Sequence, residues 1–235
     1  MIKPSHFHSN KRAHNWLIYD IGDKYLIKYS KFFTGDVVDL GAGSSPYKNF
    51  ILRTANSYTS VDWSKSLHET NLDIIADLNE YLPLDSDKYD TVLSFSVLEH
   101  LKEPQLHLNE AYRICKNGGK IFIQVPFQWA IHEAPYDYFR FTKHGLQYIL
   151  GQAGFVDIKI EAQAGFFTTL SMKINYFGTR FLKGPKFVIF IIKNFFLKPL
   201  WFLTQISAPI LDLLDRTWAT EASGYCAIAF KKKLT

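Results

Sequence analysis

Acidic residues and glycines follow short apolar runs in this chain, an arrangement typical of ligand-binding turns. The clearest case is the run 37–40, which contains Asp39 and is followed by Gly41 and Gly43. Its β-branched and apolar residues favour a strand buried on both faces, and the glycines let the backbone turn sharply and approach a ligand closely. Pro46 suits the first turn of a following helix. These features predict a nucleotide-type pocket, although Gly-x-Gly alone also fits a plain structural turn.

A second candidate lies one strand–helix–strand unit further along the chain. Residues 58–61 predict a strand that ends at Asp62, and Trp63 follows it. In dinucleotide-type folds an acid at this place accepts hydrogen bonds from ribose hydroxyls, and the indole of Trp63 could stack on a base. The alternative is that Asp62 is an ordinary loop residue. A further acid, Asp77, lies in another short apolar run at 74–78.

Strands and helices alternate through most of the chain. Apolar runs predict strands at 37–40, 58–61, 74–78, 89–94, 120–125, 155–161 and 225–230, and helical spacing predicts helices at 16–33, 47–55, 103–116 and 142–153. Gly22 is expected to divide the first helix, and 117–119 to end the third as a left-handed cap. This alternation predicts an α/β fold with a Rossmann-like, mostly parallel seven-stranded sheet covered by helices on both faces. Ligands bind such sheets at the carboxyl ends of the strands.

Composition narrows the class of protein. The chain has 235 residues, a net charge of +5 and two cysteines, which suits one α/β domain with an appendage. Two cysteines provide neither a disulfide framework nor metal-ligand spacing, so we expect both to be reduced in the cytosol. Paired histidines on a helix are lacking and the acids are dispersed, so no metal site is expected. Residues 1–14 contain no apolar core of signal-peptide length and predict a mobile arm.

Taken together, these segments resemble a class I S-adenosylmethionine-dependent methyltransferase. The similarity covers about residues 36–161. It rests on the segments 37–43, 76–78, 89–101 and 108–119 and on Asp62. The Glu-His pair that ends the third segment, and the pattern Leu-x-Glu-x-x-Arg-x-x-x-x-Gly-Gly in the fourth, are common in the small-molecule branch. Residues 126–142 resemble methyltransferases encoded with the enzymes of bacterial surface-polysaccharide and glycolipid biosynthesis.

The resemblance implies that S-adenosyl-L-methionine is the cofactor. Asp39, Gly41 and Gly43 would line its methionine end and ribose, and Asp62 would hold the ribose hydroxyls. One departure from the motif is that residues 44–46, Ser-Ser-Pro, replace the third glycine that is often present.

Three further cofactor contacts follow from the resemblance. Asp77 and Leu78 would contact the adenine, and Ser94 would lie close to the methionine moiety.

The segment after the fifth predicted strand carries side chains suited to an acceptor. Methyl transfer from a sulfonium is an in-line displacement, and an acceptor hydroxyl benefits from losing its proton as it attacks. His132 is the candidate base because a histidine titrates near neutral pH, and Glu133 or Asp137 could orient its ring. Arg140 could bind an anionic acceptor. The alternatives are a structural His132 and an Arg140–Asp137 pair that only braces the loop.

A basic, apolar insertion at 162–224 separates the last two predicted strands. The span 162–211 holds no Asp or Glu, and it carries Lys173, Arg180, Lys183, Lys186, Lys193 and Lys198. Because lysines, Pro199 and Pro209 interrupt its apolar runs, it predicts one or two helices on an anionic membrane surface rather than a spanning helix. A homodimer or partner contact, a lid over the acceptor pocket and plain core are the alternatives, and nucleic acid fits less well.

The sequence therefore predicts four regions: an N-terminal arm with covering helices at 1–35, a cofactor-binding core at 36–161, the insertion at 162–224, and a last strand with a basic tail at 225–235. The predicted function is O-methylation of a sugar or related small acceptor of a lipid-linked surface glycan. We expect it in the cytoplasm, at the inner face of the plasma membrane. The alternatives are a NAD-dependent oxidoreductase on the same fold and a non-catalytic membrane-associated adaptor.

Overall fold

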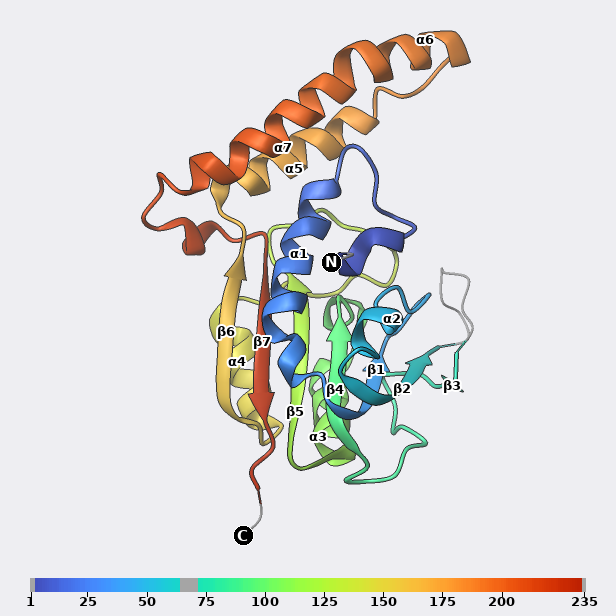
Figure 1. Ribbon diagram of the computed structural model, residues 1–235, viewed down its shortest axis with the longest axis vertical. Helices are drawn as coiled ribbons and strands as arrows, with labels where there is room; N and C mark the ends of the chain where they lie inside the picture. Colours follow the sequence, from blue (N-terminus) through green and yellow to red (C-terminus); the bar gives the residue numbers. More distant parts are fainter. Residues whose placement is uncertain (1–2, 64–71, 234–235) are drawn as a thin grey trace. The chain divides into compact units, whose positions relative to one another are not determined.

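The computed structural model describes residues 3–63 and 72–233 and divides into two compact units. The core unit comprises Leu26–Glu161 and Gly224–Thr235, and the helical unit comprises Met1–Tyr25 and Ala162–Ser223 (Figure 1). The predicted regions differ from this division, because the first 25 residues group with the insertion.

The core unit is built on one seven-stranded sheet with the order β3-β2-β1-β4-β5-β7-β6. The strands are β1 (Gly35–Leu40), β2 (Ala55–Asp62), β3 (Ile74–Ile75), β4 (Tyr89–Phe95), β5 (Cys115–Pro126), β6 (Val156–Gln163) and β7 (Gly224–Phe230). Strands β1 to β5 pair in parallel, and β7 runs antiparallel to β5. The predicted mostly parallel sheet is confirmed. Parallel pairing brings the carboxyl ends of β1 to β5 to one edge of the sheet.

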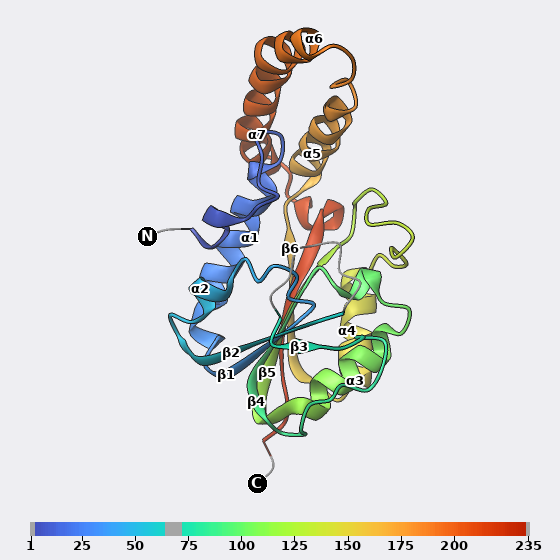
Figure 2. The same ribbon diagram turned by 90° about the vertical axis from the view of Figure 1, so that its right-hand side faces the viewer.

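Helices cover both faces of this sheet. Helices α3 (Pro104–Ile114) and α4 (Lys143–Gln152) lie on one face, and α2 (Lys48–Ile51) lies on the other with the end of α1 (Trp16–Tyr29) (Figure 2). The core is closely packed: the rings of Tyr29 and Phe33 each lie 5.3 Å from the ring of Phe122. The two cysteines are free and buried.

Three element boundaries differ from the prediction. Helix α1 continues through Gly22, and the helix expected at 47–55 is reduced to α2. Residues 117–119 lie inside β5 instead of capping α3. Gly118 has φ +78°, and a Cβ on Gly119 would lie 2.7 Å from the sulfur of Cys115. The glycines therefore allow an irregular start to the strand, where the register of β4 and β5 shifts.

The helical unit is a hairpin in which α5 (Phe166–Thr179) packs along α7 (Lys198–Asp212) (Figure 1). Helix α6 (Lys186–Ile191) and a π-helical segment, Ile192–Leu197, precede α7 without a break. Contrary to the expectation from the prolines, the helix continues through Pro209 and through Pro199. Pro199 is tolerated because it occupies the first turn of α7, directly after the wider π-helical turn.

The continuous helix Lys186–Asp212 has 27 residues and a mean hydropathy of 1.6, and only 11% of its apolar window is buried. By length and composition alone, within the described residues, it is long and apolar enough to cross a membrane.

Residues between Ser5 and Leu17 are hydrogen-bonded within the helical unit, contrary to the predicted mobile arm. The backbone N–H and hydroxyl of Ser5 both donate to Asp23. The side-chain amide of Asn15 donates to the hydroxyl of Tyr176. Gln205 accepts from the N–H of Leu17 at 3.0 Å. These bonds attach the first residues to the hairpin, a pairing of distant segments that no local sequence signal indicates.

One carboxylate joins the two ends of the hairpin. Asp212, at the end of α7, accepts hydrogen bonds from the backbone N–H groups of Gly165, Phe167 and Thr168 at 3.0, 2.8 and 3.3 Å. These groups lie at the start of α5, where N–H groups lack intrahelical partners and a negative charge is favoured. Asp212 is only 9% exposed, so its loss would leave buried donors unpaired.

We predict that Asp212→Ala lowers the free energy of unfolding by about 1–3 kcal/mol, because three donors lose a charged acceptor. Chemical denaturation followed by circular dichroism measures the change. Asp85→Ala is the matched control, since the Asp85 side chain is 86% exposed. Equal stability of the two variants would show that the hydrogen bonds of Asp212 at the start of α5 do not stabilise the protein.

Candidate functional site

The glycine turn after β1 has the tight backbone that a cofactor loop requires. Gly41 and Gly43 have φ of +83° and +52°, in the left-handed region that favours glycine. A Cβ on Gly41 would lie 2.2 Å from a methyl group of Val97. The N–H groups of Gly41 and Ala42 both donate to the carbonyl of Val61 at the end of β2. The turn is thus held directly over the carboxyl ends of the strands, as the sequence predicts.

Asp39 provides a buried carboxyl group beneath this turn. It is 2% exposed, and its Oδ2 accepts a 2.6 Å hydrogen bond from the hydroxyl of Tyr58. Its Oδ1 has no hydrogen-bond partner among the described residues. The pKa of Asp39 is raised to about 7, chiefly because the carboxyl group is buried. The hydrogen bond from Tyr58 lowers this pKa, and the negative charge of Asp62 raises it. An unsatisfied buried oxygen indicates a place for a ligand donor. Tyr58 carries no sequence signal for this role.

Asp62 and Trp63 lie at the end of β2, beside the same turn. Asp62 accepts the N–H of Gly43 at 2.8 Å, so the carboxylate and the glycine turn are fixed to each other. The indole of Trp63 meets the ring of Tyr136 edge-on at 5.0 Å. This contact joins the end of β2 to the segment after β5. Asp62, predicted to hold the ribose, is thus bonded to the glycine turn, and Trp63, predicted to stack on the base, contacts Tyr136.

The residues predicted to contact the adenine and the methionine moiety differ in accessibility. Asp77 is exposed, Leu78 is buried, and Asp77 accepts from the backbone N–H of Asn79 at 2.9 Å. Ser94 is fully buried, and its hydroxyl lies 3.3 Å from Nε2 of His107. The hydroxyl of Ser94 is therefore turned into the protein interior against α3, and the closeness of this residue to the methionine moiety stays a prediction.

The segment 130–140 after β5 is tied to the short 3₁₀ helix Leu98–His100 after β4. The N–H groups of Tyr138 and Phe139 both donate to the carbonyl of Glu99, at 2.8 and 3.2 Å. Nδ1 of His100 bonds to the carbonyl of Tyr136. Two loops that are distant in sequence thus form one wall of the site at the carboxyl edge of the sheet.

Within this wall, His132, Asp137 and Arg140 form a cluster. The guanidinium of Arg140 binds both oxygens of Asp137, at 2.6 and 2.8 Å. Asp137 also accepts the N–H of His132 at 2.9 Å. The pKa of Asp137 is held well below its usual range, chiefly by the hydrogen bonds from Arg140. Arg140 therefore braces the loop, as in the alternative interpretation, and both of its terminal nitrogens are already engaged.

The ring of His132 remains able to accept a proton. Burial, chiefly, and the neighbouring His100 lower the pKa of His132, so the neutral imidazole predominates at pH 7. Its Nδ1 lies 3.3 Å from Oδ2 of Asp137 and 3.3 Å from the carbonyl of Ala130. The structure thus brings Asp137 to His132 as the predicted orienting group. Glu133 has φ +52° and lies beside His100 instead, with 3.8 Å between Oε2 and Nε2.

Glu99 is a buried acid to which sequence reasoning assigned no catalytic role. It is fully buried, and neither carboxylate oxygen has a hydrogen-bond partner among the described residues. Burial raises the pKa of Glu99 to about 8. An acid inside an apolar run followed by histidine, Leu98-Glu99-His100, was the available signal.

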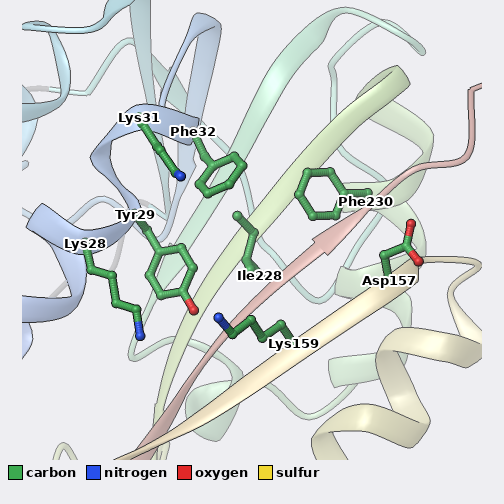
Figure 3. Close-up of a pocket in the computed structure, with 8 residues that line it drawn as sticks. All are labelled: Lys28, Tyr29, Lys31, Phe32, Asp157, Lys159, Ile228 and Phe230. Atoms are coloured by element: carbon green, nitrogen blue, oxygen red, sulfur yellow. The ribbon is translucent and has the colours of Figure 1, made fainter.

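A separate pocket lies elsewhere on the core unit (Figure 3). Lysines and aromatic rings line it, with Lys28, Lys31, Lys159, Tyr29, Phe32 and Phe230 among them. Phe230 pairs with Lys120, which pairs with Thr91 near the start of β4. This pocket therefore lies toward the opposite edge of the sheet from the glycine turn, and it contains none of the predicted site residues.

Comparison with protein families agrees with this geometry. Residues 38–123 match the family model described as "Methyltransferase domain". These residues contain the glycine turn, Asp62 and the Glu99–His100 pair. Residues 38–123 are therefore similar to a methyltransferase domain.

Solved structures share the fold of the methyltransferase domain. A SAM-dependent methyltransferase from Archaeoglobus fulgidus is 20% identical with a TM-score of 0.58, and the match covers 90% of this chain and 94% of that one. Phosphoethanolamine N-methyltransferase 2 of Haemonchus contortus, in complex with S-adenosyl-L-methionine, is 17% identical with a TM-score of 0.56. That match covers 94% of this chain and 56% of the other.

Among curated proteins, the ubiquinone biosynthesis O-methyltransferase of Coxiella burnetii (strain Dugway 5J108-111) is 25% identical over 116 residues. The match covers 45% of this chain and 50% of that protein. The chain thus spans about half the length of the curated relatives it matches.

For the methyltransferase domain we predict that Asp39→Asn changes the pH dependence of stability. Folding raises the pKa of Asp39. Its contribution to the stability of the folded state is therefore fully present below the unfolded pKa near 3.8, and it is lost as the pH rises through the folded pKa of about 7. Asparagine keeps an acceptor for Tyr58 and does not ionise. The cofactor-free variant should therefore gain stability relative to the wild type from pH 4 to pH 8, by up to about 4 kcal/mol.

Urea denaturation across this pH range measures the difference. Asp85→Asn is the control. If the free energy of unfolding depended on pH in the same way for Asp39→Asn and the wild type, the raised pKa of Asp39 would be contradicted.

Proposed function

We propose that this protein is an S-adenosylmethionine-dependent methyltransferase that methylates an oxygen of a sugar or related small acceptor of a lipid-linked surface glycan. The observation that carries the proposal is the glycine turn, with Asp39 beneath it and Asp62 bonded to it, at the carboxyl edge of the sheet. The curated relative is an O-methyltransferase by name, which supports oxygen as the methylated atom. The glycan acceptor rests on the resemblance of residues 126–142.

The residues present fit the cofactor. The unpartnered Oδ1 of Asp39 can accept a donor from it. Asp62 would accept from the ribose hydroxyls, and Trp63 would stack on the base. When bound, S-adenosylmethionine supplies a methyl group on a sulfonium. The protein has to position the acceptor oxygen in line with that methyl group and exclude water.

On the acceptor side, His132 is the residue suited to take the proton that the attacking hydroxyl loses. Its neutral ring and its contact with Asp137 support this role. Arg140 holds Asp137 in place, so it acts as a positioning residue rather than as an anion receptor. The loss of the hydroxyl proton to His132 would accompany formation of the O–CH₃ bond and cleavage of the S–CH₃ bond.

We predict that Asp62→Ala weakens S-adenosylmethionine binding about tenfold or more, because two ribose hydroxyls lose a charged acceptor. Calorimetric titration measures this, with circular dichroism to check folding and Asp85→Ala as the control. NADH is the comparison ligand. Saturable binding of NADH alone would overturn the proposal in favour of an oxidoreductase, and binding of neither ligand by folded protein would favour the adaptor.

We further propose that the helical unit binds an anionic membrane surface, at the cytoplasmic face. The hairpin reverses the usual distribution of polarity. Its buried residues include Thr168, Ser171, Asn175 and Gln205, whereas its exposed side chains are mostly large and apolar. They include Phe177, Phe187, Phe195, Phe196, Phe202, Leu203, Ile206, Ile210 and Leu214, each more than a third exposed. An apolar exterior over a polar interface is unfavourable in water and suits lipid.

Helix length favours lying on the membrane over crossing it. The helix Lys186–Asp212 would extend about 40 Å and α5, with 14 residues, about 21 Å. The hydrocarbon core is about 30 Å thick. The shorter helix of the hairpin cannot cross it, and Arg180, Lys183 and Lys186 around the hairpin tip are suited to phosphate headgroups.

We predict that the protein sediments with vesicles that contain anionic phosphatidylglycerol, and much less with neutral phosphatidylcholine vesicles. The combined variant Phe195→Ser, Phe196→Ser and Leu203→Ser should lose most of this binding, because it removes exposed apolar area. The matched control is Tyr81→Ser with Ile131→Ser, since these side chains of the core unit are 78% and 81% exposed.

Equal binding by the two combined variants would contradict the membrane proposal. A stable dimer of the wild type in solution that the hairpin variant loses would replace it with a subunit contact. Resistance of the membrane-bound protein to alkaline carbonate would indicate a spanning helix instead of a surface helix.

A further inference from the structure

Three potential metal ligands meet where the loops after β4 and β5 join. A carboxylate oxygen of Glu99, a ring nitrogen of His100 and a ring nitrogen of His132 all lie within 4.8 Å of one another. The rings of His100 and His132 have centroids 4.7 Å apart. Glu99 and His100 are consecutive, but His132 comes from the other loop. Only the folded chain brings the three together, which is why the sequence predicted no metal site.

Each histidine has its Nδ1 directed to an acceptor. Nδ1 of His100 bonds to the carbonyl of Tyr136, which can only accept. Nδ1 of His132 lies 3.3 Å from the carbonyl of Ala130 and 3.3 Å from the carboxylate of Asp137. In both rings Nδ1 therefore carries the proton, and the lone pair is on Nε2. Metal-binding histidines are oriented in this way, with the second nitrogen donating to a carbonyl or carboxylate.

Glu99 supplies an independent observation. Its side chain is fully buried, and neither of its oxygens has a hydrogen-bond partner among the described residues. Its Oε1 lies 3.8 Å from Nε2 of His100. A buried carboxyl group without partners is costly unless a charge or donor completes it. A cation between the carboxylate and the two imidazoles would remove this cost.

We propose that Glu99, His100 and His132 bind a divalent transition metal ion of the Zn²⁺ class. Two imidazoles and one carboxylate form a known zinc donor set that leaves a coordination position open. Donors around a tetrahedral zinc ion lie about 3.4 Å apart at bond lengths near 2.1 Å, so side-chain rotations must bring these three closer by up to about 1.4 Å. The carboxylate of Glu133, 3.8 Å from Nε2 of His100, is within reach as a further ligand.

This inference deepens the acceptor side of the proposed function and rests on it only for the ion's role. An ion with an open position would polarise an acceptor hydroxyl and lower its pKa. With the ion bound, His132 would act as a ligand in place of the base, with Asp137 and Arg140 holding its ring, and the acceptor hydroxyl would lose its proton to water. Metal binding itself can be measured without turnover.

The experiment is titration of chelator-treated, folded protein with Zn²⁺ by calorimetry and with Co²⁺ by visible absorption. We expect one equivalent of Zn²⁺ and a Co²⁺ spectrum typical of nitrogen and oxygen ligands. Glu99→Gln and His132→Asn should each weaken binding at least about tenfold. His144→Asn, at an exposed histidine on α4, should bind like the wild type.

Three outcomes would overturn the proposal: no Zn²⁺ uptake by folded wild type, more than one equivalent bound non-selectively, or equal weakening in His144→Asn. If Glu99→Gln fails to fold, His132→Asn carries the test, because His132 is part-exposed on a loop. S-adenosylmethionine titration of the metal-free protein separates the two proposals. Cofactor binding without Zn²⁺ uptake would remove the metal and leave the methyltransferase.

Discussion

The site depends on the burial of two carboxyl groups at the carboxyl edge of one parallel sheet. Asp39 and Glu99 are 2% and 0% exposed, and at least one oxygen of each lacks a hydrogen-bond partner among the described residues. Burying an acid without a full set of partners opposes folding. The parallel strands impose this arrangement because β1 and β4 are adjacent and end at the same edge. Both acids therefore stand where a bound ligand can supply the missing partners.

The two acids have different surroundings, which suggests different partners. Asp39 has a neutral donor, Tyr58, and lies beneath a turn whose two glycines have positive φ. Glu99 has two imidazoles nearby and no donor to either oxygen. A cofactor with donor groups suits the first environment and a cation suits the second. One sheet edge can thus hold two chemically distinct subsites, one beneath the glycine turn and one where the loops after β4 and β5 meet.

The sequence predicted features that depend on neighbouring residues, and it missed features that depend on residues far apart in the chain. The alternation of strands and helices and the glycine turn follow from local patterns, and both are confirmed. The cluster of Glu99 with His132 and the pairing of Asn15 with Tyr176 join segments far apart in the chain, so no local pattern indicates them. The contact of Ser94 with His107 on α3 likewise depends on packing between elements, so no local pattern indicates it.

Arg140 shows how the loop after β5 acquires a defined shape. A guanidinium with a free fork would favour an anionic acceptor, but here both terminal nitrogens bond to Asp137, and only Nε has no hydrogen-bond partner among the described residues. Asp137 in turn fixes the backbone and ring of His132. The charge pair thus determines where one imidazole lies relative to Glu99 and His100. Selectivity for the acceptor must then come from other groups on this wall, since its one arginine is engaged in holding the histidine.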